Sequence, residues 1–268
     1  MTEAKTRKKL SKTGKRVMDI ILVISLLVAI FSGYKLITGL RTYEEAKKAY
    51  GTIRDEVVVV KDVETSEDNA EQKPAEREIN WEKLWDVSKD VVGWIHMDDS
   101  SIDYPVVHYT DNDYYLRRLL DGTWNDAGTI FVEAENKKNF EDQVTVIYGH
   151  HMLNQPYMFR EIESFGDPAY YETHKVIEFE TPDKKYYLYP IAGIYETAYA
   201  DYVKQNFENE DECKAYIDDF VSRSTFKGEE TLQPTDKMVV LSTCEYKVHS
   251  VDGRFALLTK LVEAKEGE

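Results

Sequence analysis

The stretch Val239-Val240-Leu241-Ser242-Thr243-Cys244 joins an apolar, β-branched run to a reactive thiol at its end. Such a run favours a buried strand, and the two hydroxyl residues suit a strand end that reaches the lining of a site. Ten positions beyond the cysteine, Arg254 opens a second apolar run, Phe255-Ala256-Leu257-Leu258, after the turn signal Asp252-Gly253. If the two runs pair as antiparallel strands, the thiol and the guanidinium lie at the same end of one sheet.

A third run, Val144-Thr145-Val146-Ile147-Tyr148-Gly149-His150, has the same form and delivers an imidazole at its exit. A thiol, an imidazole and a guanidinium at strand ends suit a nucleophile, a proton shuttle and an oxyanion donor. A free thiol has a pKa of about 8.5 and needs a nearby cation, which His150 or Arg254 could supply. His151 competes with His150 for the role of base, and because side chains alternate along a strand we expect only one of them to face the thiol.

Short strands dominate the chain from position 93 onward. They are β-branched or aromatic and are bounded by Asp, Asn, Gly or Pro. The predicted strands are Gly93–His96, Ile102–Val107, Gly128–Glu133, Val144–Tyr148, Val176–Glu180, Lys185–Tyr195, Lys237–Thr243 and Arg254–Val262. Helices are predicted at Asp113–Leu120, Tyr157–Ser164 and Asn209–Ser224. This pattern predicts a mainly β (α+β) fold, a closed or nearly closed barrel with helices on its outside.

The N-terminus is basic and is followed by an apolar segment. Positions 1–40 hold eight Lys/Arg against two acidic residues, a net charge of +6. Since the whole chain has a net charge of −16, the remaining residues carry −22. As a helix, Val17–Leu40 would span about 36 Å, enough for a bilayer core of about 30 Å. No small-x-small cleavage site follows, so we expect a retained anchor with a cytoplasmic N-terminus and an extracellular body. The acidic body makes nucleic acid an unsuitable partner.

Composition divides the chain into four segments. Thr42 to about Lys61 predicts a short helix, and the acidic, apolar-poor stretch Asp62–Glu78 is typical of a solvated linker. We therefore expect a basic cytoplasmic segment (1–16), a transmembrane signal-anchor (17–40), a helical stalk with an acidic linker (41–78) and a catalytic domain (79–268).

The two cysteines have different surroundings. Cys213 lies on the apolar face of the helix predicted at Asn209–Ser224, where a small core residue is expected. Cys244 is then a free thiol outside the cell, and a catalytic function would explain it.

With these residues in view, the chain resembles the sortases, and class B sortases in particular. The resemblance covers roughly residues 79–263 and rests on these stretches: Tyr148-Gly149-His150-His151-Met152, Leu241-Ser242-Thr243-Cys244, Arg254, Asp90–Ile95, Ile102–Val107 and Asp113–Leu116. It implies an eight-stranded sortase-type barrel with peripheral helices and an N-terminal helical extension. It also implies a membrane-anchored cysteine transpeptidase of Gram-positive cell surfaces.

The resemblance implies a role for each matching residue. Cys244 is the nucleophile, His150 the acid/base, and Arg254 the oxyanion and substrate-positioning group. Substrate contacts are implied for Asn112, Leu116, Tyr202, Ser242 and Glu245. No cofactor and no metal are expected, since no Cys-x-x-Cys or His-x-x-x-His spacing supports a zinc site.

The implied partners are an exported protein with a C-terminal Pro-x-Thr-type sorting signal and an amine that receives it. The enzyme would cleave after Thr and join the Thr carboxyl to an amine of a cell-wall precursor. A pilus-assembling sortase would instead use a pilin lysine. Asn-Pro-x-Thr and Ser-Pro-x-Thr signals are both compatible with the sequence.

Two other interpretations follow from the residues alone. A hydrolytic cysteine peptidase would use water to resolve the acyl enzyme. The papain-like order places the cysteine before the histidine, unlike this chain, and the Gln-Ala-Cys signature of caspases is absent. A surface module that only binds peptide would need no exposed thiol.

Overall fold

The computed structural model describes residues 12–61, 76–152, 155–200, 202–249 and 252–265. It divides into two compact units, Met1–Glu45 and Ala46–Glu268. The helix α1 (Lys12–Val57) runs from the first unit into the second. Within the described residues, α1 is long and apolar enough to cross a membrane. The apolar segment predicted at 17–40 lies within this helix.

The last turns of α1 belong to the second unit. Ala46, Tyr50 and Val57 are buried there, and the ring of Tyr50 packs edge-on against Tyr104 with centroids 5.4 Å apart. The Tyr50 hydroxyl donates a hydrogen bond of 2.6 Å to the carbonyl of Gly128. The second unit therefore includes residues of the segment 41–78, for which a stalk and linker were predicted.

The helix expected over Thr42–Lys61 ends at Val57. The β-branched residues that follow form β1 (Val58–Lys61), which pairs antiparallel with β2 (Glu76–Ile79). Most of the linker expected at Asp62–Glu78 lies outside the described residues, and its last three positions belong to β2.

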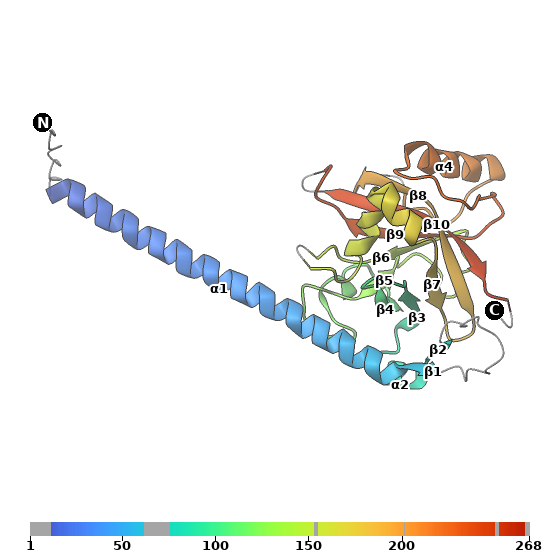
Figure 1. Cartoon of the computed structure of the whole chain (residues 1–268), viewed down its shortest axis with the longest axis horizontal. Helices are drawn as coiled ribbons and strands as arrows, with labels where there is room; N and C mark the ends of the chain where they lie inside the picture. Colours follow the sequence, from blue (N-terminus) through green and yellow to red (C-terminus); the bar gives the residue numbers. More distant parts are fainter. Residues whose placement is uncertain (1–11, 62–75, 153–154, 201, 250–251, 266–268) are drawn as a thin grey trace, which may run out of the picture. The chain divides into compact units, whose positions relative to one another are not determined.

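The predicted eight-stranded barrel is confirmed. In the described residues its strands are connected in the closed order β10-β8-β7-β3-β4-β5-β6-β9 (Figure 1). Their bounds are β3 (Val91–His96), β4 (Asp103–His108), β5 (Ile130–Val132), β6 (Val144–Tyr148), β7 (Ile177–Glu180), β8 (Lys185–Thr197), β9 (Met238–Cys244) and β10 (Gly253–Glu263). The apolar runs that predicted them are almost entirely buried in β5, β6, β9 and β10.

Strand direction brings the reactive residues to one rim. β6 pairs with β9 in parallel, with Tyr148 opposite Ser242, so both strands run towards the same end of the barrel. β10 pairs antiparallel with β9 and begins at that end, with Arg254 opposite Cys244. The exits of β6 and β9 and the start of β10 therefore meet at one rim.

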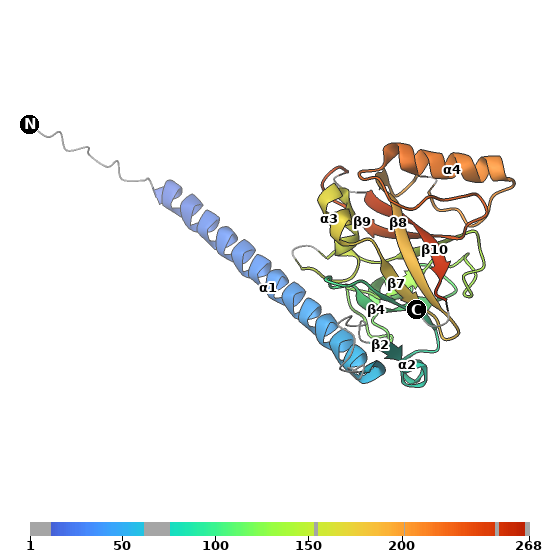
Figure 2. The same ribbon diagram turned by 45° about the vertical axis from the view of Figure 1, so that its right-hand side comes forward.

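Short helices surround the barrel. They are α2 (Trp81–Val87), α3 (Pro168–Thr173) and α4 (Glu210–Arg223), with 3₁₀ helices η1 (Tyr115–Arg117) and η2 (Arg160–Gly166). Asn80 caps α2, because its side-chain oxygen accepts from the N–H of Lys83 at 3.1 Å. Figures 1 and 2 show α4 beside β8, and it buries Cys213, Ile217 and Phe220.

The prediction of a helix at Asp113–Leu120 is wrong, since only the 3₁₀ helix η1 forms there. A helix there would use the carbonyls of residues 113 to 116 for its own amides. Instead, the Tyr115 carbonyl accepts from the N–H of Thr129 at 3.0 Å and the Leu116 carbonyl from His150 Nε2 at 2.6 Å. The helix expected over Tyr157–Ser164 is likewise replaced by η2, which is displaced towards Gly166.

The buried Tyr50 hydroxyl gives a test of the boundary of the second unit. Tyr50→Phe should lower the free energy of unfolding by about 1–2 kcal/mol, because the Gly128 carbonyl loses its donor in a buried setting. Chemical denaturation of the full chain in micelles, followed by tryptophan fluorescence, measures this change. Tyr34→Phe is the matched control, since Tyr34 is 63% exposed in the first unit. Equal effects of the two changes would contradict the boundary at Ala46.

Candidate active site

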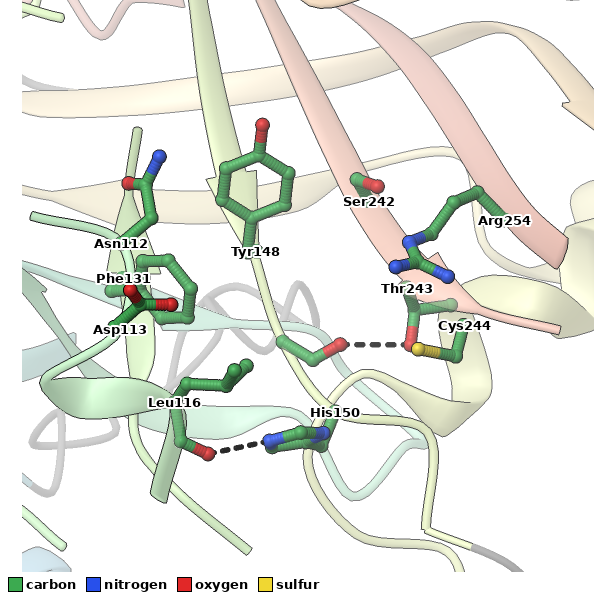
Figure 3. Close-up of a pocket in the computed structure, with 11 residues that line it drawn as sticks. Asn112, Asp113, Leu116, Phe131, Tyr148, His150, Ser242, Thr243, Cys244 and Arg254 are labelled. Carbon is green, nitrogen blue, oxygen red and sulfur yellow. Dashed lines mark hydrogen bonds between the residues drawn. The ribbon is translucent and has the colours of Figure 1, made fainter. Parts of the chain in front are cut away.

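The rim where β6, β9 and β10 meet holds a pocket of about 260 Å³. Its wall contains the three reactive residues of the sequence analysis, His150, Cys244 and Arg254 (Figure 3). The other lining residues are Asn112, Asp113, Leu116, Phe131, Tyr148, Gly149, Ser242 and Thr243. The structure thus brings a thiol, an imidazole and a guanidinium to one cavity.

The end of β9 is tied to the turn that carries His150. Thr243 Oγ1 donates a hydrogen bond of 2.9 Å to the Gly149 carbonyl, and the Gly149 N–H donates to the Ser242 carbonyl at 3.1 Å. The turn also packs closely against Phe159, and only glycine fits at position 149, because a Cβ there would meet the ring of Phe159 at 2.5 Å. These bonds hold the thiol and the imidazole at the same rim.

His150 has a fixed ring orientation. Its Nε2 donates a hydrogen bond of 2.6 Å to the Leu116 carbonyl, which accepts only, so Nε2 carries a proton. Burial lowers the pKa of His150 below 6.5, and the hydrogen bond to Leu116 opposes this only in part. Near neutral pH the ring is therefore neutral, with the Nδ1 lone pair available to take a proton.

The lowered pKa of His150 predicts a pH effect on stability. Between the folded pKa and the unfolded value near 6.5, the unfolded chain binds more protons, so stability is lost as the pH falls through this range. Acidification from about pH 7.5 to 5.5 should lower the melting temperature of the wild type more than that of His150→Gln, whose amide does not titrate. Thermal scans of both proteins test this, and parallel curves would contradict the lowered pKa.

The charge of Arg254 is not neutralised by a carboxylate. Its Nη1 donates to the Gly253 carbonyl at 2.9 Å, and it forms no ion pair within the part of the chain that the structure describes. Its neighbour in register on β8, Glu196, instead pairs with Arg223. The guanidinium in the pocket can therefore receive a developing negative charge.

Glu245, which could have paired with Arg254, is bonded to the loop that follows β9. It is fully buried and accepts from the N–H groups of Lys247, Val248 and His249 at 2.8, 2.8 and 2.7 Å. Burial would raise the pKa of Glu245, but these bonds lower it overall. The carboxylate orders the loop and is not part of the pocket wall.

The structure separates the two histidines as expected. His151 is absent from the pocket wall, and its Nε2 lies 2.9 Å from Glu163 Oε2 in a buried pair, with both side chains less than a tenth exposed. Lys247 adds a second contact of 2.8 Å to Glu163 Oε1. His150 is therefore the histidine that faces the pocket.

The residues for which substrate contacts were implied divide into two groups. Asn112, Leu116 and Ser242 line the pocket, whereas Tyr202 and Glu245 do not. Tyr202 is buried behind Ser242, with a hydrogen bond of 2.9 Å between the two hydroxyl oxygens. In this structure Tyr202 supports a lining residue and does not itself form the wall.

Several lining residues were missed from the sequence. They are Asp113, Phe131, Tyr148 and Gly149, whereas Thr243 lines the pocket beside Ser242, as its place at the strand end suggested. Tyr148 could have been found, because residues two apart on a strand share a face and His150 follows it by two positions. Phe131 and Asp113 come from segments with no such link to the reactive residues.

The chain that forms this pocket is similar to known proteins in both sequence and structure. The family model described as Sortase domain matches residues 95–262. Sortase B of Listeria monocytogenes is 31% identical over 239 residues, which cover 88% of this chain and 92% of that protein. A solved sortase B of Bacillus anthracis is similar with a TM-score of 0.70 at 27% identity, covering 84% of this chain and 100% of that one. A Staphylococcus aureus sortase B–substrate complex has a TM-score of 0.65 at 28% identity, covering 69% and 85%.

Proposed function

The chain belongs to the sortase family, in class B, and is a cysteine transpeptidase; from this premise we propose that it cleaves a C-terminal Pro-x-Thr-type sorting signal after Thr and transfers the Thr carboxyl to an amine of a cell-wall precursor. In this proposal Cys244 is the nucleophile, His150 the acid/base and Arg254 the oxyanion donor. The observation that carries it is the register pair of Cys244 and Arg254 beside His150 in one pocket.

The first half of the reaction forms a thioester. The Cys244 thiol gives its proton to Nδ1 of His150, and the sulfur attacks the Thr carbonyl carbon. The carbonyl oxygen becomes negative as the tetrahedral intermediate forms, and the guanidinium of Arg254 donates hydrogen bonds to it. The peptide C–N bond then breaks, and His150 passes its proton to the leaving nitrogen.

The second half of the reaction forms the new amide. The incoming amine loses a proton to His150 as its nitrogen attacks the thioester carbon. The oxyanion forms again beside Arg254, the C–S bond breaks, and Cys244 leaves as a thiolate that recovers a proton from His150. The protein thus returns to its starting state, and no metal enters these steps.

The N-terminal helix supports a location for this reaction at the outer face of the cell membrane. We place the basic end of α1 in the cytoplasm and the barrel outside the cell, because Lys and Arg are concentrated before the apolar segment. A retained anchor would hold the enzyme where exported proteins and wall precursors meet. The orientation is tested by introducing a cysteine on the surface of the barrel and treating intact cells with a membrane-impermeant maleimide. Labelling of that cysteine supports a barrel outside the cell, and absence of labelling would contradict it.

The proposal is tested with the full chain in detergent micelles and a panel of quenched Asn-Pro-x-Thr and Ser-Pro-x-Thr peptides. Each peptide is incubated alone, with a glycyl peptide amine, or with a lysine side-chain amine, and the products are weighed by mass spectrometry. Cleavage after Thr with the glycyl amine attached supports wall anchoring, and attachment of lysine alone would favour pilus assembly. Release of free acid regardless of amine would replace transpeptidation with hydrolysis.

A further inference from the structure

A buried carboxylate lies behind the pocket wall and has no part in the reaction described above. Glu133 directly follows β5 and is only 7% exposed. Its backbone N–H donates to the Val146 carbonyl at 2.8 Å, which fixes it between β5 and β6. It forms no ion pair within the residues that the structure describes.

Both oxygens of this carboxylate hold side chains of the pocket wall. Asn112 Nδ2 donates to Oε1 at 2.6 Å, and the Tyr148 hydroxyl donates to Oε2 at 2.8 Å. The backbone N–H of Ala134 donates to Asn112 Oδ1 at 2.8 Å, which settles the orientation of the amide. One carboxylate thus positions two lining residues that come from separate segments of the chain.

We propose that Glu133 is a positioning residue for peptide binding, which holds Asn112 and Tyr148 in the geometry that receives the sorting signal. The inference rests on the proposed function, because it concerns the same pocket. A buried carboxylate is costly unless it is hydrogen-bonded, and a role in packing alone would be filled better by an apolar residue. Here the charge is used to accept two short bonds from pocket residues.

The protonation of Tyr148 agrees with this role. Burial and the neighbouring charge of Glu133 raise the pKa of Tyr148, so the phenol keeps its proton. That proton is donated to Glu133, and the lone pairs of the hydroxyl oxygen are left to accept from a peptide. Asn112 Nδ2 keeps a second N–H that can donate.

The position of the pair sets the kinetic expectation. Figure 3 shows Asn112 and Tyr148 on the side of the pocket away from Cys244 and His150. Ser242 lies opposite Tyr148 in register, two positions before Cys244 on β9. A change at Glu133 should therefore weaken the contacts with the part of the peptide that lies away from the reacting carbonyl. The chemistry at the thiol should stay unchanged.

Glu133→Gln is the main test, because the amide keeps the shape but cannot accept from both partners. In the full chain, KM for the sorting peptide should rise about tenfold, because one of the two lining side chains is no longer held in place for the peptide, while kcat stays within about twofold. The rate of Cys244 alkylation by iodoacetamide should not change. Glu135→Gln is the matched control, since Glu135 is an exposed carboxylate two positions further on.

A binding measurement makes the test independent of turnover. In a Cys244→Ala background, Glu133→Gln should raise the Kd of the uncleaved peptide by the same factor. Tyr148→Phe, which removes one of the two bonds and leaves the carboxylate, should also raise Kd, and adding it to Glu133→Gln should have less than its full effect. An unchanged Kd, or a fall in kcat and alkylation without a change in Kd, would overturn the inference. Turnover by Cys244→Ala would instead refute the proposed function and leave the Glu133 result interpretable as binding.

Discussion

Cys244→Ala is expected to abolish both peptide cleavage and amine transfer, with kcat lowered by about 10⁴-fold or more. The reason is chemical: the other hydroxyl groups of the pocket wall, on Ser242 and Thr243, are weaker nucleophiles than a thiolate and are hydrogen-bonded to Tyr202 and to the Gly149 carbonyl. The fold should survive, because the Cys244 side chain is partly exposed at the end of β9 and fills no core position. The measurement is product formation with peptide and amine, together with intact-mass detection of the thioester on the wild type.

Cys213→Ala is the matched control for this change. Cys213 is fully buried in α4, and burial raises the pKa of its thiol, so it is an unreactive core residue. Its replacement should cost about 1–2 kcal/mol of stability, from lost packing and from the lost contact of 3.2 Å with Gln143 Nε2. Activity per folded molecule should be retained. An acyl adduct that disappears in Cys213→Ala and persists in Cys244→Ala would reverse the assignment.

The barrel and its reactive rim were predictable from the same stretches of sequence. The apolar runs predict the buried strands, and the polar residues at their ends predict where the site lies. The run that ends in Cys244 and the run that begins at Arg254 predicted two buried strands, and their antiparallel pairing brings the two residues into register. The parallel pairing of β6 with β9 then places His150 beside them. No single residue carried the prediction; it rested on three strands whose ends had the same character.

Tertiary contacts explain what the sequence did not reveal. The Leu116 carbonyl, which a helix over Asp113–Leu120 would have used, accepts from His150 Nε2 instead, and this bond exists only when the rim is assembled. Val58–Lys61 became a strand because β2 was available to pair with it. Glu133 follows an apolar strand and resembles an ordinary surface carboxylate. Its burial and its two partners depend on segments twenty-one positions before it and fifteen positions after it.

Arg254→Ala should lower kcat by about 10²–10³-fold, as expected when a donor to a developing oxyanion is removed. Since Arg254 has no carboxylate partner in the described residues, this change leaves no buried charge unpaired, and stability should change little. Arg254→Lys keeps the positive charge and loses the planar set of donors, so it should recover only part of the activity. Steady-state kinetics with peptide and amine measure both variants.

Alkylation of Cys244 by iodoacetamide separates two roles that a guanidinium opposite a thiol could have. Displacement of iodide from a saturated carbon creates no tetrahedral oxyanion, so a group that acts only on the oxyanion has no effect on this rate. If Arg254 is the oxyanion donor, Arg254→Ala should lower kcat and leave alkylation within about twofold of the wild type. If Arg254 instead stabilises the thiolate, both rates should fall together, because alkylation also needs the ionised sulfur. A parallel fall would therefore reassign Arg254 from the oxyanion to the nucleophile.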